Sequence, residues 1–263
     1  MSARSPATAL SITAFVSLLS IGFLMGANHV AARVAFDHGV DVVTAIAVRS
    51  TATALVVGLV LLGQRVPLAL TSRQRRFLPA IGLAIAVQSA CLYSAVARLP
   101  VALALLAFNT YPLWTALWAR LLYRHRPERR VVLAMPVMLV GLALALDVLG
   151  AASGVGAALQ WQLIGTGVAF ALTAAGVFGL ALVLTQHEAG GLDGRLRTAA
   201  TMSIVAVLAL AAVAWRGGFR LPDASAGWVG LALLTLFYGT GITILFVVLP
   251  RLGVVGNAAI MNV

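Results

Sequence analysis

The stretch LPVALALLAFNTYPLWTALWARLLY, residues 99–123, decides how the rest of the chain is interpreted. A helix rises 1.5 Å per residue, so about 20 residues cross a hydrocarbon layer about 30 Å thick. This apolar run of 25 residues is therefore predicted to form one membrane-spanning helix. Asn109 and Pro112 lie near its middle, at the depth of the bilayer centre.

Pro112 predicts a break in this helix. Proline has no N–H, so residue 112 cannot bond the carbonyl of Phe108, and its ring displaces that carbonyl. In lipid, backbone groups freed in this way are tolerated where neighbouring helices, side chains or a water-filled cavity satisfy them. Discontinuous helices recur at the binding sites of transporters, but proline is also common in membrane helices, where a kink can serve packing alone. Both interpretations stay open at this point.

The composition is incompatible with a water-soluble globular protein. Of the 263 residues, 62% are hydrophobic and 10% are charged, and the mean hydropathy is +1.04, whereas about a quarter of the residues in soluble domains are charged. The net charge of +11 comes from arginines in short connections between apolar runs, a pattern typical of membrane orientation rather than of nucleic-acid binding. Because Cys91 is the only cysteine, no internal disulfide or cysteine-based metal site is expected.

Continuous apolar runs predict an all-α polytopic membrane protein with eight spans and part of a ninth. A run of about 20 apolar residues is the expected length of one transmembrane helix. The ninth run starts at Leu252. The eight full runs are residues 12–36, 42–63, 77–97, 99–123, 131–149, 161–185, 198–215 and 227–249.

The distribution of arginine predicts how these spans are oriented. Thirteen of the 18 arginines lie at the N-terminus or in the even-numbered connections, and the positive-inside rule places that side in the cytoplasm. Trp161, Trp215 and Trp228 then fall at the outer interface, where aromatic belts occur. The thirteen are Arg4, Arg65, Arg73, Arg75, Arg76, Arg120, Arg124, Arg126, Arg129, Arg130, Arg195, Arg197 and Arg251.

An internal repeat divides the chain into two halves. Residues 151–160, AASGVGAALQ, are small and uncharged and are predicted to link a first half, 1–150, to a second half, 161–263. With a shift of 153 residues, residues 92–110 align with residues 245–263. Five spans separate the copies, so they run in opposite directions, as in an inverted-topology repeat. The identical positions in the first copy are Leu92, Arg98, Leu99, Val101 and Asn109.

The same alignment predicts that the second half is incomplete. The counterpart of Pro112 would fall two residues beyond Val263. We therefore expect the chain to be part of a ten-span protein that carries five spans in each half.

Several motifs occur in a characteristic order along the chain. They are MGANHVAARVA at 25–35, AIAVRS at 45–50, ARLPVALALLAFNTYPLWTALWA at 97–119 and GLALLTLFYGTGITILFVVLPRLGVVGNAAIMN at 230–262. Together they resemble the drug/metabolite transporter superfamily, EamA type. The resemblance implies ten spans in two inverted repeats, a bacterial inner membrane, and efflux of amino acids or related metabolites. Met25 replaces a family tryptophan, and RHRPER at 124–129 replaces a family Leu-Gly-Glu, so no role is assigned to Glu128.

Polar side chains inside the spans are the candidates for a substrate pathway, since a transporter needs a polar cavity rather than covalent chemistry. Amide, imidazole and aromatic groups suit a small organic solute. The candidates are Asn28, His29, Arg49, Tyr93, Asn109, Tyr111, Pro112, Tyr238, Asn257 and Asn262.

Structural roles compete with these functional ones. A charge at membrane depth costs about 2.5–3.5 kcal/mol, so Arg49 either attracts a substrate carboxylate or pairs with Asp37 or Asp41. Asn28 and His29 either contact a solute or form hydrogen bonds between helices, worth about 0.6 kcal/mol each. No Asp or Glu is predicted at the midplane, so the sequence does not support a carboxylate proton relay.

The leading hypothesis is a transporter that moves small organic metabolites by alternating access, with a small-molecule substrate and the lipid bilayer as its partners. Nucleic acid, a metal and a cofactor are not expected, and a homodimer stays open. One alternative is an intramembrane enzyme, but no GxSxG, HExxH or aspartate pair lies within a span, and His187 and Glu188 are assigned to a polar connection. The other is a non-transporting membrane assembly protein, which the inverted repeat disfavours.

Overall fold

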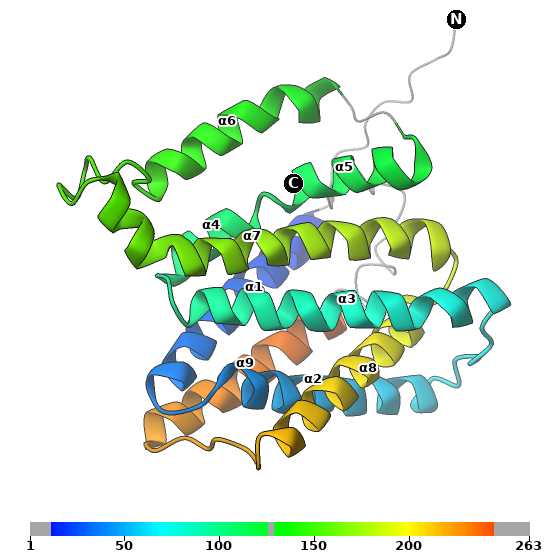
Figure 1. The fold of residues 1–263 in the computed structure, drawn as a ribbon. Coiled ribbons are helices and arrows are strands. Elements are labelled where there is room, and N and C mark those ends of the chain that lie inside the picture. The colour runs from blue at the N-terminus through cyan, green and yellow to red at the C-terminus, as the bar shows by residue number, and fades with distance from the viewer. Residues whose placement is uncertain (1–11, 126–128, 245–263) are drawn as a thin grey trace, which may run out of the picture.

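The computed structural model describes residues 12–125 and 129–244, and this part of the chain is helical with no strand. Most of the helices run side by side, with connections at the two ends of the bundle (Figure 1). They are α1 (Ile12–Asp37), α2 (Val42–Gly63), α3 (Ser72–Val96), α4 (Val101–Phe108), α5 (Tyr111–Tyr123), α6 (Arg129–Ala145), α7 (Ala157–Glu188), α8 (Gly194–Trp215) and α9 (Ser225–Thr243).

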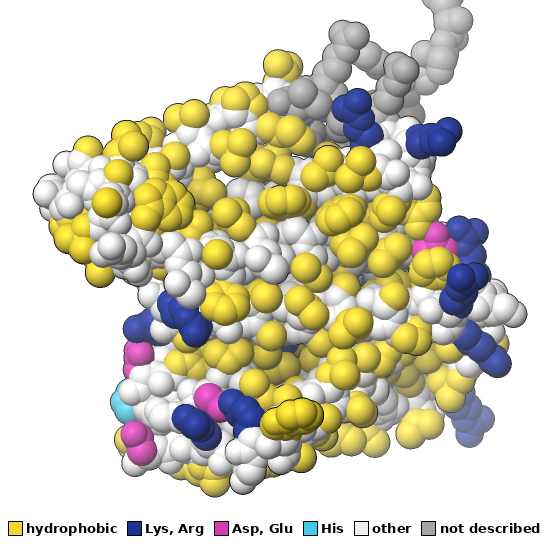
Figure 2. Space-filling view, viewed as in Figure 1, with side chains coloured by type: hydrophobic (Ala, Val, Ile, Leu, Met, Phe, Trp, Pro, Cys, Tyr) yellow, Lys and Arg dark blue, Asp and Glu magenta, His cyan; other side chains and the backbone are white. Residues whose placement is uncertain are grey.

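Seven segments of the described chain are long and apolar enough to cross a membrane. They are α1, α2, α3, α4 together with α5, α7, α8 and α9. The predicted run 131–149 overlaps α6, whose apolar part, Met135–Ala145, is shorter than the seven spans. On the face shown in Figure 2, hydrophobic side chains cover the middle of the bundle and arginines gather toward its two ends. The protein is therefore a multi-pass membrane protein.

The predicted break within residues 99–123 is present. The run folds as two helices, α4 and α5, that are separated at Asn109 and Thr110. Pro112 lies in the first turn of α5, where its missing N–H has no helical partner to lose. The hydroxyl of Thr110 donates to the carbonyl of Ala107 at 2.8 Å, which satisfies one of the acceptors at the end of α4.

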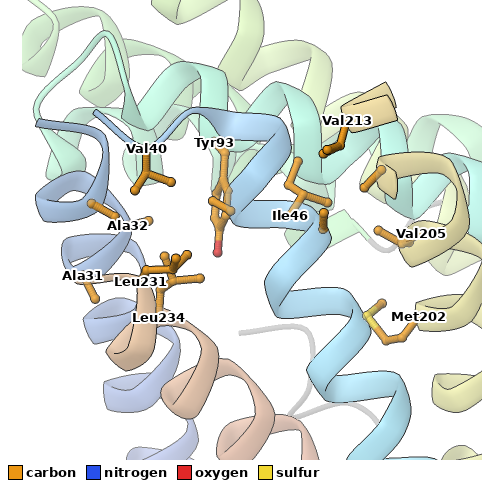
Figure 3. Packing of buried hydrophobic residues seen from close by; sticks show 14 residues of the cluster. Ala31, Ala32, Val40, Ile46, Tyr93, Met202, Val205, Val213, Leu231 and Leu234 are labelled. Carbon is orange, nitrogen blue, oxygen red and sulfur yellow. The ribbon is translucent and has the colours of Figure 1, made fainter. Parts of the chain in front are cut away.

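Three helix pairs form the frame of the bundle: α1 packs along α9, α2 along α8, and α3 along α7. Ala32, Ile46, Val205 and Leu234 contribute to one buried core, with the ring of Tyr93 among them (Figure 3). The backbones of α1 and α9 approach closely at Gly230, where a Cβ atom would lie 2.7 Å from the backbone nitrogen of Ala35.

At one end of the bundle, called here the Asp41 end, a carboxylate joins α2 to α8. Asp41 caps α2 by accepting a hydrogen bond from the backbone N–H of Thr44 at 2.8 Å. It also forms an ion pair with Arg216, the residue that caps the C-terminus of α8. The start of α2 therefore lies beside the end of α8, and the two helices are antiparallel.

At the opposite end, called here the Glu188 end, the start of α8 lies beside the end of α2. Asp193 caps α8 by accepting a hydrogen bond from the backbone N–H of Arg195 at 2.8 Å. The guanidinium of Arg195 donates to the side-chain oxygen of Gln64, the residue that caps the C-terminus of α2. Polar contacts thus tie α2 and α8 together at both ends.

Several predicted boundaries differ from the observed ones, among them the starts of α3 and α7. The third span was predicted from residue 77, but α3 begins at Ser72 with a capping box formed by Thr71 and Gln74. Helix α7 begins at Ala157, inside the predicted linker 151–160. In both places the helix continues into residues that a hydropathy window does not include.

Candidate functional site

Arg49 is buried in the interior of the bundle. It lies about two turns into α2, about 10 Å from the start of the helix by its rise per residue, and 3% of its surface is exposed. A charged side chain at this depth is costly unless partners stabilise it, so its surroundings identify the candidate site.

The guanidinium of Arg49 contacts hydroxyls and aromatic rings. Its Nη1 donates to the hydroxyl of Tyr93 at 3.1 Å, and its Nη2 donates to the hydroxyl of Ser89 at 3.0 Å, both on α3. Its central carbon lies 3.9 Å from the ring centre of Tyr238 on α9 and 4.8 Å from that of Tyr93. The negative face of an aromatic ring attracts a cation, so neutral groups on two helices hold the charge.

Helix α1 completes the group. The hydroxyl of Tyr93 donates to Oδ1 of Asn28 at 3.0 Å, and the His29 ring meets the Tyr93 ring edge-on, with centres 5.8 Å apart. Asn28 and Tyr93 are each 1% exposed. We call the set Asn28, His29, Arg49, Ser89, Tyr93 and Tyr238 the Arg49 cluster.

Of the two alternatives left open for Arg49, the pairing with Asp37 or Asp41 does not occur in the structure. Asp37 pairs with Arg33, one helical turn earlier on α1, at 3.0 Å, and Asp41 pairs with Arg216. Both carboxylates form ion pairs with arginines that lie nearer the Asp41 end than Arg49 does. Among the described residues, Arg49 has no carboxylate partner.

Three buried polar atoms of the cluster lack a hydrogen-bond partner in the part of the chain that the structure describes. They are Nδ2 of Asn28, Nδ1 of His29 and Nε of Arg49. A buried polar group left without a partner costs about 1–3 kcal/mol, and such groups are rare in folded proteins. Three of them in one cluster mark a place where a polar ligand has hydrogen bonds to gain.

Ser89 was not predicted as a site residue. It lies four residues before Tyr93, and residues at that spacing share one face of a helix. This spacing was the available sequence signal, once Tyr93 was singled out as a candidate.

The remaining candidates lie apart from the cluster. Tyr111 packs against the rings of Phe108 and Phe178, with centres 5.7 and 5.2 Å away. Asn109 caps the end of α4 and is exposed, and Pro112 follows at the start of α5. No hydrogen bond or ring contact joins these three residues to the Arg49 cluster within the described chain. Asn257 and Asn262 lie outside the described residues.

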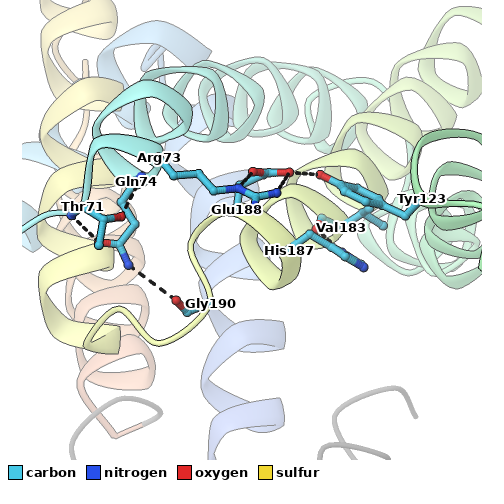
Figure 4. Close-up of polar contacts among 8 residues, drawn as sticks. All are labelled: Thr71, Arg73, Gln74, Tyr123, Val183, His187, Glu188 and Gly190. Carbon is cyan, nitrogen blue, oxygen red and sulfur yellow. Dashed lines mark hydrogen bonds and ion pairs between the residues drawn. The ribbon is translucent and has the colours of Figure 1, made fainter.

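A second polar cluster lies at the Glu188 end, and it was not predicted from the sequence. Glu188 was assigned to a polar connection, but it is the last residue of α7 and is 5% exposed. Nη2 of Arg73 donates a hydrogen bond to the Glu188 carboxylate at 3.0 Å. The hydroxyl of Tyr123 donates a second one at 2.5 Å (Figure 4). The Tyr123 ring stacks on His187 with centres 3.8 Å apart. These contacts join α3, α5 and α7.

An apolar groove of about 690 Å³ lies between α2 and α9. Its walls include Val56, Trp228 and Leu236, of which 48%, 50% and 60% respectively is exposed. The polar side chains of the Arg49 cluster do not line it. It is therefore distinct from the candidate site.

The cluster combines a cation, amide and imidazole groups and aromatic faces. Groups of these kinds can bind and orient a polar solute. Within residues 12–125 and 129–244, no group of three or more His, Cys, Asp or Glu side chains is arranged to hold a metal ion.

Comparison with known proteins gave one family. A family model described as the EamA-like transporter family matches residues 12–146, which contain α1 to α6 and all of the Arg49 cluster except Tyr238. No curated protein matches the chain.

Proposed function

The chain belongs to the EamA-like transporter family, whose members are generally non-enzymatic membrane transporters, and on this premise we propose that it moves small organic metabolites across a membrane by alternating access. Amino acids and related compounds are the proposed substrates, and efflux is the proposed direction. The substrate binds at the Arg49 cluster.

The observation that carries this proposal is the contact between Arg49 and Tyr238. Arg49, Tyr93 and Asn28 belong to the proposed first half, 1–150, and Tyr238 belongs to the proposed second half, 161–263. Substrate sites of transporters with inverted repeats lie between the repeats, near the bilayer midplane. A rocking motion of one half against the other would separate Tyr238 from Arg49 and admit solute.

The helix lengths and caps support the inverted repeat. Helices α2 and α8 are both 22 residues long, and their capping residues, Asp41 and Asp193, lie 152 positions apart. This separation differs by one residue from the shift of 153 that aligns residues 92–110 with 245–263. Nearly the same shift along the sequence thus relates the helix caps and the sequence motifs of the two proposed halves.

The packing of the helices supports the same symmetry. An operation that exchanges the halves turns α1 into α7, α2 into α8 and α3 into α9. It therefore converts the pair α1 and α9 into the pair α7 and α3, and leaves the pair α2 and α8 unchanged. These are the three pairs that form the frame of the bundle.

The contacts at the two ends suggest how access is controlled. Arg216 and Asp41 join α8 to the start of α2 at one end, and Glu188 joins α3, α5 and α7 at the other. Each set of contacts connects helices that must separate before solute can reach the Arg49 cluster from that end. The proposed cycle breaks them alternately.

The charge distribution supports the proposed placement. Thirteen of 18 arginines lie on the side of the Glu188 end in the predicted topology, and basic residues are retained in the cytoplasm. The proposed protein has a cytoplasmic N-terminus in a bacterial inner membrane, so the Glu188 end faces the cytoplasm and the Asp41 end faces outward.

Flux through reconstituted vesicles tests the transport proposal. Vesicles with the wild-type protein are compared with empty vesicles for a panel of labelled amino acids and related metabolites. Arg49→Ala is the site variant, and Arg75→Ala, at an exposed position near the start of α3, is the matched control. We expect flux of at least one solute that Arg49→Ala abolishes and Arg75→Ala retains. Absence of flux across the panel contradicts transport, and flux that survives Arg49→Ala contradicts the site.

A further inference from the structure

We infer that the Arg49 cluster binds the carboxylate of a small organic acid, and that this carboxylate supplies the counter-ion that the buried guanidinium does not find among residues 12–125 and 129–244. This inference rests on the proposed function, because it names the substrate class of the same site.

The charge balance is the first argument. Arg49 is 3% exposed and its contacts are two hydroxyls and two aromatic rings, all of them neutral. Arginine stays protonated in proteins, so the positive charge cannot be removed by loss of a proton. A buried charge without a counter-ion is unfavourable, and a bound anion removes that penalty.

The supply of hydrogen-bond donors is the second argument. Nε of Arg49 and Nδ2 of Asn28 are both donors, and both are buried without a partner in the described part of the chain. Tyr93 Oη lies between the two residues, since it accepts from Arg49 and donates to Asn28. Two unused donors near one cation match the two oxygens of a carboxylate.

The same features favour a carboxylate over other ligands. One carboxylate cancels the single charge of Arg49, whereas a phosphate carrying about two negative charges would leave an uncompensated anion in a site with few donors. An ammonium group gains nothing here, because the described acidic residues lie outside the cluster and the Tyr238 ring already faces Arg49. The site therefore selects for the acid end of a solute.

Thermal stabilisation of the purified protein in detergent tests this without relying on transport. The probes are matched sets of solutes: alanine, propionate and alaninamide; leucine, 4-methylpentanoate and leucinamide; phenylalanine, 3-phenylpropanoate and phenylalaninamide; and inorganic phosphate. A ligand that binds only the folded protein raises its melting temperature. We expect at least one carboxylate to raise it, with the matched amide and phosphate at least about tenfold weaker.

Three variants test whether the carboxylate binds at the Arg49 cluster. Arg49→Gln is expected to weaken carboxylate binding about 100-fold or more, as loss of one member of a buried charge pair does, and Arg49→Lys is expected to restore part of it. Asn28→Asp places a carboxylate of nearly the same shape one hydrogen bond from the guanidinium, on the other side of the Tyr93 hydroxyl. We expect this variant to melt at a higher temperature than the wild type and to bind no carboxylate probe.

The outcomes separate this inference from the transport proposal. Equal binding of acids and amides, binding that survives Arg49→Gln, binding that survives Asn28→Asp, or no response to any carboxylate overturns the inference. Because Asn28→Asp is expected to gain stability, misfolding cannot imitate its result. Flux of neutral solutes without carboxylate binding would leave transport standing and refute the carboxylate site. Carboxylate binding without flux would support the carboxylate site and refute transport.

Discussion

The guanidinium carbon of Arg49 lies 3.9 Å from the ring centre of Tyr238, although the two residues are far apart in the sequence. This contact is the point at which α9 covers the charge carried by α2. The polar contacts of Arg49 on its other sides come from α3. The Tyr238 ring is thus the part of the cluster contributed by α9.

Replacing Tyr238 separates the role of its ring from that of its hydroxyl. Tyr238→Leu removes the aromatic face above a desolvated cation, and we expect a loss of about 1–2 kcal/mol in the free energy of unfolding. Tyr238→Phe keeps the face and loses only a weak contact to the sulfur of Met202 at 3.7 Å, so it should stay close to wild type. Thermal unfolding in detergent measures both. Equal losses in the two variants would show that the ring face is unimportant.

Tyr93→Phe tests the hydrogen-bond chain of the cluster. Its hydroxyl joins Arg49 to Asn28, so its removal leaves buried polar groups unsatisfied and should destabilise the fold by about 1–3 kcal/mol. Tyr111→Phe is the matched control, because Tyr111 contacts the rings of Phe108 and Phe178, contacts that phenylalanine retains. Similar melting temperatures for the two variants would refute the chain.

The contacts of Glu188 with Arg73 and Tyr123, called here the Glu188 cluster, should contribute more to the stability of the fold than an exposed ion pair does. Glu188 is nearly fully buried and accepts from Arg73 and Tyr123, whereas the pair of Arg33 and Asp37 lies on the surface of α1. Exposed pairs contribute little. We therefore expect Glu188→Gln to lower the melting temperature more than Asp37→Asn does. The reverse order would mean that the Glu188 cluster does not hold α3, α5 and α7 together.

Asp41 predicts how stability depends on pH. Burial opposes ionisation of this carboxyl, but the Arg216 guanidinium and the N–H of Thr44 outweigh it and lower its pKa below the usual value. A lowered pKa in the folded state adds stability above the ordinary carboxyl pKa, and that stability is lost as the pH falls through the lowered pKa.

The matching measurement compares the wild type with Asp41→Asn across pH. Asparagine keeps the helix cap and removes the charge, so the wild type should melt at a higher temperature at neutral pH and lose this advantage in acid. Asp41→Ala should cost about 1 kcal/mol more than Asp41→Asn, because the cap is lost as well. A pH-independent difference between wild type and Asp41→Asn would refute the role of the charge.

The sequence predicted the features that depend on local pattern. The span 42–63 coincides with α2, and Pro112 marked the break between α4 and α5. Hydropathy alone missed the first turn of α3 and the last turn of α7, because both are helical yet polar. Polar residues at the ends of spans can be capped and paired, as Thr71 and Glu188 are.

The site was predicted as a set of polar residues without their arrangement. Asn28, His29, Arg49, Tyr93 and Tyr238 were selected because a transporter needs a polar cavity formed by polar groups inside spans. The structure brings these five residues together. The lack of a carboxylate partner for Arg49 was not predictable, since Asp37 and Asp41 are near it in sequence. It depends on contacts between helices that are distant along the chain.

The central claim is that the Arg49 cluster is reached from each side of the membrane in turn, and the most direct test is the reactivity of a single cysteine placed in it. Cys91 is the only native cysteine, so Cys91→Ser gives a cysteine-free protein, and Ser89→Cys in that background puts a thiol beside Arg49. A membrane-impermeant thiol reagent is then applied to one side of oriented vesicles or to the other. The account predicts labelling from both sides, slowed by a bound carboxylate, and labelling from neither side or from one side only would contradict it.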